Sequence, residues 1–189
     1  MTLNTPRGYT YPEYTDPADF PAQIQDFATD VDLDITNNLE TPITEALDAP
    51  SVRAFKAAGG QAVAVNTNVT ITFTTETYDN DNMFNVGVST TNVVVNTPGI
   101  YFLSGSVNLA PTGAAGGAAA LILASTGGVV PNPVGVSHNL DNDKDTSLSC
   151  MTLHRVAVVP ETITMFVRHN HANPLTAAAA QLTATRISR

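Results

Sequence analysis

Beyond Ser51, apolar residues alternate with threonine, serine and asparagine at a spacing of two along most of the chain. In the clearest case, Val69, Ile71 and Phe73 alternate with threonines. Successive side chains of a strand point to opposite faces of a sheet, so this pattern predicts a half-buried strand with a threonine outer face. Further strands are expected over Ile100–Leu109, Ala118–Leu123, Ser147–Val159, Thr162–His171 and Leu182–Ser188.

Clusters of glycine, proline, asparagine and aspartate separate these segments, and no helical pattern occurs between them. About eight to ten short strands in about 140 residues are typical of a β-sandwich or jelly roll. Charged residues make up only 13% of the chain, so its polar surface must consist mainly of threonine, serine and asparagine, which suit extended structure. The sequence therefore predicts an all-β fold, with a jelly-roll β-sandwich head over residues 51–189.

The net charge of −9 is concentrated in the first quarter of the chain. Residues 1–50 hold ten acidic residues and one arginine, whereas residues 51–189 hold seven acids and seven bases. This division predicts an acidic attachment arm over residues 1–50 that has a different role from the head. Neither region has a basic patch, which argues against nucleic-acid binding. An N-terminus without an apolar segment argues against a signal peptide, and no apolar run approaches about 18 residues, so membrane insertion is not expected.

The start of the arm is expected to be extended. Prolines at positions 6, 12, 17 and 21 prevent a helix where Tyr9, Tyr11 and Tyr14 occur. We interpret this segment as a docking strap rather than as a disordered tail with incidental tyrosines, because disordered segments are normally poor in aromatic residues.

A helix is expected over about residues 21–39, because Ile24, Ala28, Val31, Ile35 and Leu39 recur at helical spacing. A helix of this length with one apolar stripe is not stable alone. It must pack on its own head, on other copies of the chain or on another structure. The residues expected to form this attachment are Tyr9, Tyr11, Tyr14, Phe20, Ile24 and Val31.

Four motifs follow one another in the first half of the head: Val69–Phe73, Tyr78-Asp79-Asn80, Asn92–Val95 and Thr97-Pro98-Gly99-Ile100-Tyr101-Phe102. Their order resembles the tumour-necrosis-factor and complement globular-head superfamily, which implies a jelly roll over about residues 51–189. The similar head also opens on a strand like Ser51–Phe55. The chain departs from that family at Pro160-Glu161, where a Gly-Asp turn is usual, so no ligand specificity is carried over.

The arm resembles a different group. Pro6-Arg7-Gly8-Tyr9, Tyr11-Pro12 and Asp19-Phe20-Pro21, followed by an acidic helix, are similar to the N-termini of fibre, minor tail and head-surface proteins of phages that infect actinobacteria. Together the two resemblances imply an attachment arm and a trimeric knob on the surface of a virion, made in the host cytoplasm. The expected partners are other copies of the chain, other virion proteins and a host cell-surface glycan or protein.

The expected function is therefore that of a phage virion structural protein, a tail-associated surface fibre or knob with a host-receptor-binding role. A capsid decoration or head-fibre protein that stabilises the particle is the alternative within the same class. A secreted non-viral binding module of the same fold is the alternative of another class, and the missing signal segment argues against it. We expect the trimer to form through Ile163, Met165 and Val167, which share one face of a strand that no helix of the head remains to cover.

Neither catalysis nor a cofactor is expected. The sequence has no G-x-S-x-G, Walker loop, H-E-x-x-H or Cys–His pair. Cys150, the only cysteine, lies beside Met151 in an apolar strand and is expected to be a buried, inert thiol.

Two groups of residues are considered as metal ligands, although no metal is expected. His169 and His171 share a strand face, so three copies in a trimer would bring imidazoles together. The alternative is that both lie at the wet end of the strand. Asp141, Asp143 and Asp145 resemble the first half of a calcium loop but lack the glycine and glutamate that an EF-hand requires, and the alternative is a solvated loop.

Overall fold

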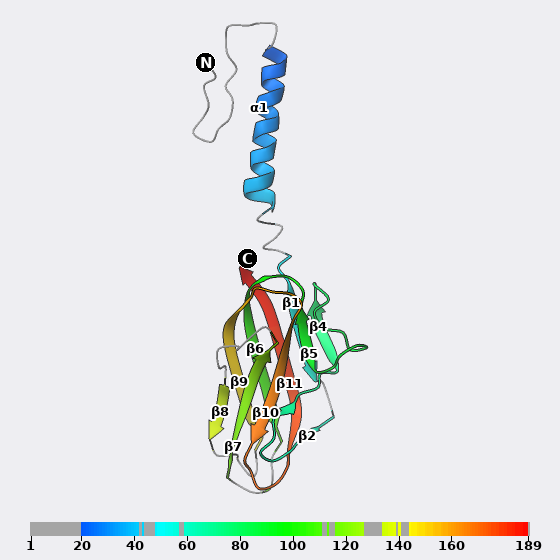
Figure 1. Cartoon of the computed structure of the whole chain (residues 1–189), viewed down its shortest axis with the longest axis vertical. Helices are drawn as coiled ribbons and strands as arrows, with labels where there is room; N and C mark the ends of the chain where they lie inside the picture. The colour runs from blue at the N-terminus through cyan, green and yellow to red at the C-terminus, as the bar shows by residue number, and fades with distance from the viewer. Residues whose placement is uncertain are drawn as a thin grey trace. The chain divides into compact units, whose positions relative to one another are not determined.

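The computed structural model describes residues 20–41, 43, 48–56, 59–110, 113, 116–126, 134–138, 140 and 144–188 (Figure 1). It divides the chain into two compact units, Met1–Asp48 and Ala49–Arg189. The predicted residues Tyr9, Tyr11 and Tyr14 lie outside the described residues, as do Asp141 and Asp143. No helix in the described part of the chain is long and apolar enough to cross a membrane.

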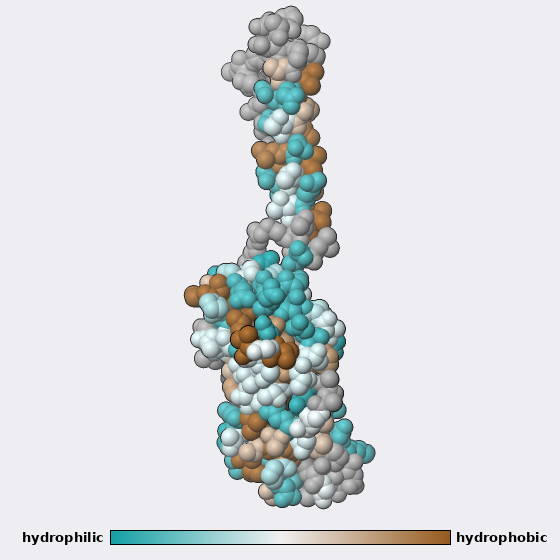
Figure 2. Space-filling view, turned by 90° about the vertical axis from the view of Figure 1, so that its right-hand side faces the viewer, coloured by the Kyte–Doolittle hydropathy of each residue, from teal (hydrophilic) through white to brown (hydrophobic). Residues whose placement is uncertain are grey.

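The described residues of the first unit are mainly helical. α1 spans Phe20–Ile35 and continues into a π-helical segment, η1, over Thr36–Glu40. Ile24, Leu33 and Leu39 are between 48% and 58% exposed. Figure 2 accordingly shows brown apolar side chains recurring along the helix among teal ones. A single copy of this unit therefore leaves apolar side chains of its helix in water.

The second unit is a sandwich of two antiparallel sheets, which confirms the predicted jelly-roll fold class (Figure 1). The six-stranded sheet has the order β4-β1-β11-β6-β9, and β2 also pairs with β11. Its strands are β1 Ser51–Lys56, β2 Gln61–Val63, β4 Thr75–Asp79, β6 Gly99–Leu109, β9 Thr146–Val156 and β11 Leu175–Ser188. The five-stranded sheet has the order β3-β10-β7-β8, and β5 also pairs with β10. Its strands are β3 Val69–Thr70, β5 Asn92–Val95, β7 Ala118–Ser125, β8 Val134–His138 and β10 Glu161–His169.

The hydrophobic core lies between the two sheets. Period-two alternation places Tyr101 and Leu103 of β6 inside, and both are fully buried. Ile163, Met165 and Val167 of β10 are also 0% exposed in a single chain. This placement contradicts the expectation that these three residues face other copies in a trimer. The six-stranded sheet already covers the face that was expected to need a partner.

One expected strand is shorter than its sequence pattern. β3 ends at Thr70, although Ile71 and Phe73 remain fully buried. The Ile71 amide still donates to the Met165 carbonyl of β10 at 2.9 Å. The side chain of Gln61 bonds the residues on either side of Ile71, because its Nε2 donates to the Thr70 carbonyl at 2.6 Å and its Oε1 accepts from the Thr72 amide at 2.9 Å. Alternation therefore located the buried residues correctly, although the regular strand ends before them.

The Tyr-Asp-Asn motif that follows is structural. The Asp79 carboxylate accepts hydrogen bonds from the amides of Met83 at 2.9 Å and Phe84 at 2.7 Å, which fixes the turn after β4. Asn80 accepts from the Ser51 amide at 2.6 Å and donates to the Ala49 carbonyl at 2.9 Å. The motif thus secures the point at which the chain begins the head.

Candidate functional site on the six-stranded sheet

The outward side chains of the six-stranded sheet are aligned in rows across its strands. Strand register sets one such row as Phe55 of β1, Gln181 of β11, Ser106 of β6 and Ser149 of β9. Residues directly opposite one another in adjacent strands have neighbouring side chains. Every second residue of a strand points outward, so successive rows are two residues apart along each strand. The polarity of the outward side chains differs from row to row.

The rows nearer the start of β6 are apolar at the β6–β9 side. Phe102 of β6 pairs with Leu153 of β9, and Ser104 pairs with Met151. Phe102, Met151 and Leu153 are 36%, 66% and 56% exposed, respectively, and we call these three residues the apolar patch. Large apolar side chains gathered on one face of a soluble domain are typical of an interaction surface.

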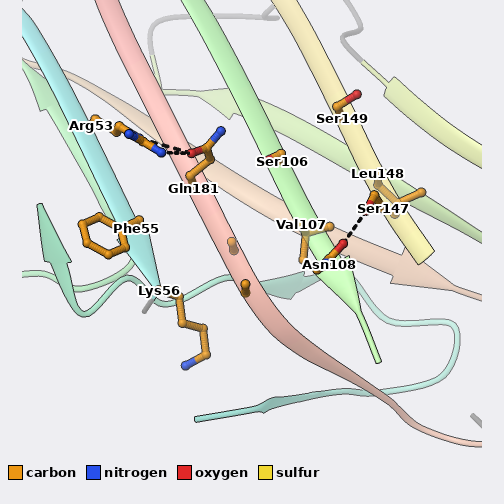
Figure 3. Close-up of a pocket in the computed structure, with 12 residues that line it drawn as sticks. Arg53, Phe55, Lys56, Ser106, Val107, Asn108, Ser147, Leu148, Ser149 and Gln181 are labelled. Carbon is orange, nitrogen blue, oxygen red and sulfur yellow. Dashed lines mark hydrogen bonds between the residues drawn. The ribbon is translucent and has the colours of Figure 1, made fainter. Parts of the chain in front are cut away.

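The rows nearer the end of β6 form a groove with a volume of about 370 Å³ (Figure 3). Small residues line its middle, including Ser106 and Ala179 on the central strands β6 and β11. Hydrogen-bonded pairs line it on either side. Arg53 donates to Gln181 Oε1 through Nε at 3.2 Å and Nη2 at 2.7 Å, and Ser147 donates to Asn108. The groove therefore lies where Ser106 and Ala179 carry short side chains between these two hydrogen-bonded pairs.

The groove is basic. Its lining includes Arg53 and Lys56, and none of the described residues that line it is acidic. Lys56 ends β1 and is only 8% exposed. Phe55, between these two cations in sequence, contributes an aromatic ring. The arrangement offers positive charge, hydroxyl and amide groups and one apolar ring to a bound molecule.

A buried polar cluster links the two sheets elsewhere in the head. His154 of β9 and Ser125 of β7 both hydrogen-bond to Oε1 of Glu161, the first residue of β10. His154 and Glu161 are 7% and 3% exposed. A nucleophilic triad would require the serine to bond to the histidine, whereas here both bond to the carboxylate. The geometry therefore indicates a structural link.

The histidines considered as metal ligands lie inside the chain. His169 is 2% exposed, and its Nε2 donates to the Val63 carbonyl at 2.8 Å, while its buried Nδ1 has no hydrogen-bond partner among the described residues. His171 is 3% exposed, and its Nδ1 accepts from the Asn173 amide at 3.0 Å. Both rings are therefore buried within the single chain. Asp145 is exposed, and the described residues contain no group of three or more histidine, cysteine or acidic side chains placed to hold a metal.

The remaining predicted site residues belong to the helix. Phe20 is the first residue of α1, Ile24 is 48% exposed and Val31 is partly exposed. The sequence reasoning did not find the apolar patch or the groove. One signal for the patch was present, because β9 carries apolar residues at both parities: Leu148 and Cys150 point inward, whereas Met151 and Leu153 point outward.

The fold and this surface define a class of domain, a jelly-roll β-sandwich with one exposed sheet face. Among solved structures, the chain is similar to the vertex protein P5 of phage PRD1, with a TM-score of 0.53 and 11% identity over 73% of each chain. It is also similar to murine APRIL, with a TM-score of 0.50 and 10% identity over 72% of this chain and 98% of that one. No family model and no curated protein matches the chain.

Proposed function

We propose that the chain is a phage virion structural protein, with a trimeric head displayed on the particle surface and an N-terminal unit that attaches it. The observation that carries this proposal is that each unit exposes apolar side chains that the single chain leaves uncovered. These are the apolar patch on the head and the helical stripe that includes Ile24. Two separate apolar surfaces require two kinds of contact. The fold similarity to a phage vertex protein supports the virion setting.

The head is proposed to trimerise through the apolar patch instead of through the buried face of β10. Burial of a large apolar side chain contributes about 1.5–3 kcal/mol. Phe102, Met151 and Leu153 from each copy therefore supply a favourable contribution against the entropy cost of association. In a trimer with closed symmetry, the apolar patch of every copy is removed from water and no copy is left exposed.

The N-terminal unit is proposed to bind another virion protein. Its helix contains Asp26, Asp30, Asp32, Asp34 and Glu40 but no basic residue. Like charges on parallel copies of this helix repel one another, which favours a basic receiving surface over self-association. Tyr9, Tyr11, Tyr14 and Phe20 are proposed to add apolar contacts there.

The tail-associated fibre with a host-receptor role is the first form of this proposal. A capsid decoration or head-fibre protein is the second, and the similarity to a phage vertex protein favours it specifically. Reconstruction of intact particles distinguishes them, because the head must appear either on the tail or on the capsid. Absence of the protein from purified particles contradicts both.

Attachment is tested by variants of the full chain. The double substitution Ile24→Ser and Val31→Ser removes two apolar residues from one side of the helix. Burial of each side chain contributes on the order of 1.5 kcal/mol or more to attachment. The double variant is therefore expected to lower the amount of protein on purified particles at least about tenfold. Leu33→Ser is the control, because Leu33 is an exposed apolar residue, at 58%, on the opposite side of the helix. Wild-type occupancy of the double variant, with unchanged melting of the head, contradicts attachment through this stripe.

A further inference from the structure

The groove on the six-stranded sheet combines features that select one class of ligand. Its volume of about 370 Å³ lies within the range of small-molecule sites, about 300–1,000 Å³. It contains two of the eight basic residues of a chain whose net charge is −9, and the described lining contains no carboxylate. A basic pocket on an acidic protein is a site for an anionic group.

The arginine in the groove is held in position for such a group. Gln181 Oε1 accepts two hydrogen bonds from the Arg53 guanidinium, through Nε and Nη2. A guanidinium has five N–H donors, so three remain for a ligand. Because Gln181 is neutral, it orients the guanidinium without neutralising its charge. Planar N–H pairs of this kind suit the oxygen atoms of a carboxylate or a phosphate.

The remaining groups in the groove suit a polyhydroxylated molecule. Within the described part of the chain, the hydroxyls of Ser106 and Ser149 form no hydrogen bond, so they are available to a ligand. They occupy the same cross-strand row as Gln181 and Phe55. Figure 3 shows Phe55 beside Arg53 at the side of the groove. Its ring offers a flat apolar surface to the C–H face of a sugar, while the serines offer hydroxyl groups to sugar hydroxyls.

We propose that this groove binds an anionic saccharide, a sugar unit that carries a carboxylate or a phosphate. Arg53, which points outward from β1, contacts the anion, and Ser106 and Ser149 bind the hydroxyls. The proposal deepens the proposed contact with the host surface and rests on that role for its biological setting. The groove lies beside the apolar patch on the same sheet face, and Arg53 belongs to the same cross-strand row as Met151 of the patch.

The test measures saccharide binding to the full chain by calorimetry. The probes are an oligogalacturonate, which carries carboxylates, a sugar-bearing glycerol-phosphate oligomer, which carries phosphates, and a neutral malto-oligosaccharide. One or both anionic probes are expected to bind at least about tenfold more tightly than the neutral one, and the stronger of the two identifies the anion. Raising the salt concentration is expected to weaken this binding, because the contact is between charges near the surface. Equal binding of all three probes, or no binding of any, overturns the proposal.

Two pairs of variants locate the site. Arg53→Ala is expected to weaken anionic binding at least about tenfold, whereas Arg168→Ala, an exposed arginine on the other sheet, is not. Ser149→Asp places a negative charge in the groove at an exposed position and is expected to weaken binding similarly, whereas Val158→Asp, which adds the same charge at an exposed position outside the groove, is not. Unchanged binding in both Arg53→Ala and Ser149→Asp overturns the assignment.

Light scattering and particle occupancy separate this proposal from the proposed function. If Arg53→Ala changes the mass of the oligomer and leaves saccharide binding intact, the groove is a subunit contact and the saccharide assignment is wrong. If the variant loses saccharide binding but keeps wild-type mass and occupancy on particles, the assignment is supported independently of attachment.

Discussion

Tyr101 shows how a single side chain of the Pro-Gly-Ile-Tyr-Phe motif serves the head. The residue is fully buried, and its hydroxyl donates a hydrogen bond to the Thr97 carbonyl at 2.7 Å. Burial raises the pKa of Tyr101 to about 12, Arg186 opposes this change and Asp81 adds to it. The phenol therefore remains a donor inside the fold at a pH where an exposed tyrosine, with a pKa of about 10, ionises.

This pKa difference predicts a dependence of stability on alkaline pH. Below pH 10 the phenol is neutral in both states, and its contribution to stability is fully present. As the pH rises from about 10 to about 12, the unfolded chain releases the proton and the folded chain does not, so the free energy of unfolding falls. Tyr101→Phe is expected to make this fall shallower. Urea unfolding of both proteins at several pH values checks it, and parallel curves contradict it.

At the scale of the elements, Glu161 joins strands of both sheets. His154 comes from β9 in the six-stranded sheet, whereas Ser125 and Glu161 come from β7 and β10 in the other. Glu161→Ala removes the acceptor of the buried His154 side chain, and an unsatisfied buried polar group costs about 1–3 kcal/mol. We expect the free energy of unfolding to fall by about that amount in urea titrations. Ser125→Ala, which leaves the pair of Glu161 and His154 in place, should lower the free energy of unfolding by a smaller amount. Equal losses in the two variants contradict the central role of the carboxylate.

The strands illustrate what alternation in a sequence can and cannot indicate. The spacing in Thr162–His171 predicted correctly that Ile163, Met165 and Val167 share one face of a strand. It could not indicate whether that face meets a second sheet or a second molecule, because both environments are apolar. The first half of β11 was not expected as a strand, since its run of alanines has no alternation of apolar and polar residues. Its place between β1 and β6 buries Ala177 and Ala180 nevertheless.

The groove could not be predicted from the sequence, for a related reason. Phe55, Ser106, Ser149 and Gln181 come from four strands that are distant in sequence. Only the strand order and the register place them in one row. Each residue alone is an ordinary outward position of its strand, so no local pattern distinguishes it. The helix, in contrast, depends on contacts within a few residues, and its range followed from apolar spacing.

At the scale of the whole molecule, the apolar patch predicts the assembly state. The wild-type chain is expected to have about three times the single-chain mass of 19.8 kDa in light scattering at micromolar concentration. Combined Met151→Glu and Leu153→Glu substitutions place like charges from three copies at the contact and should reduce the mass to that of one chain. Val158→Glu is the control, because Val158 is 76% exposed but lies outside the strands of this face. A wild-type monomer contradicts the trimer, and a trimeric double variant places self-association elsewhere.

The position of β11 also determines when the head can fold during synthesis. This last strand pairs with β1, β2 and β6, so Leu182 has Ala54 on one side and Gly105 on the other. Until the ribosome has released β11, the earlier strands lack the centre of their sheet and expose unpaired backbone and apolar side chains. Pairing between the two ends of the domain also slows folding. The head therefore folds as a unit after its synthesis, and a truncation within β11 removes the middle of the sheet rather than one edge.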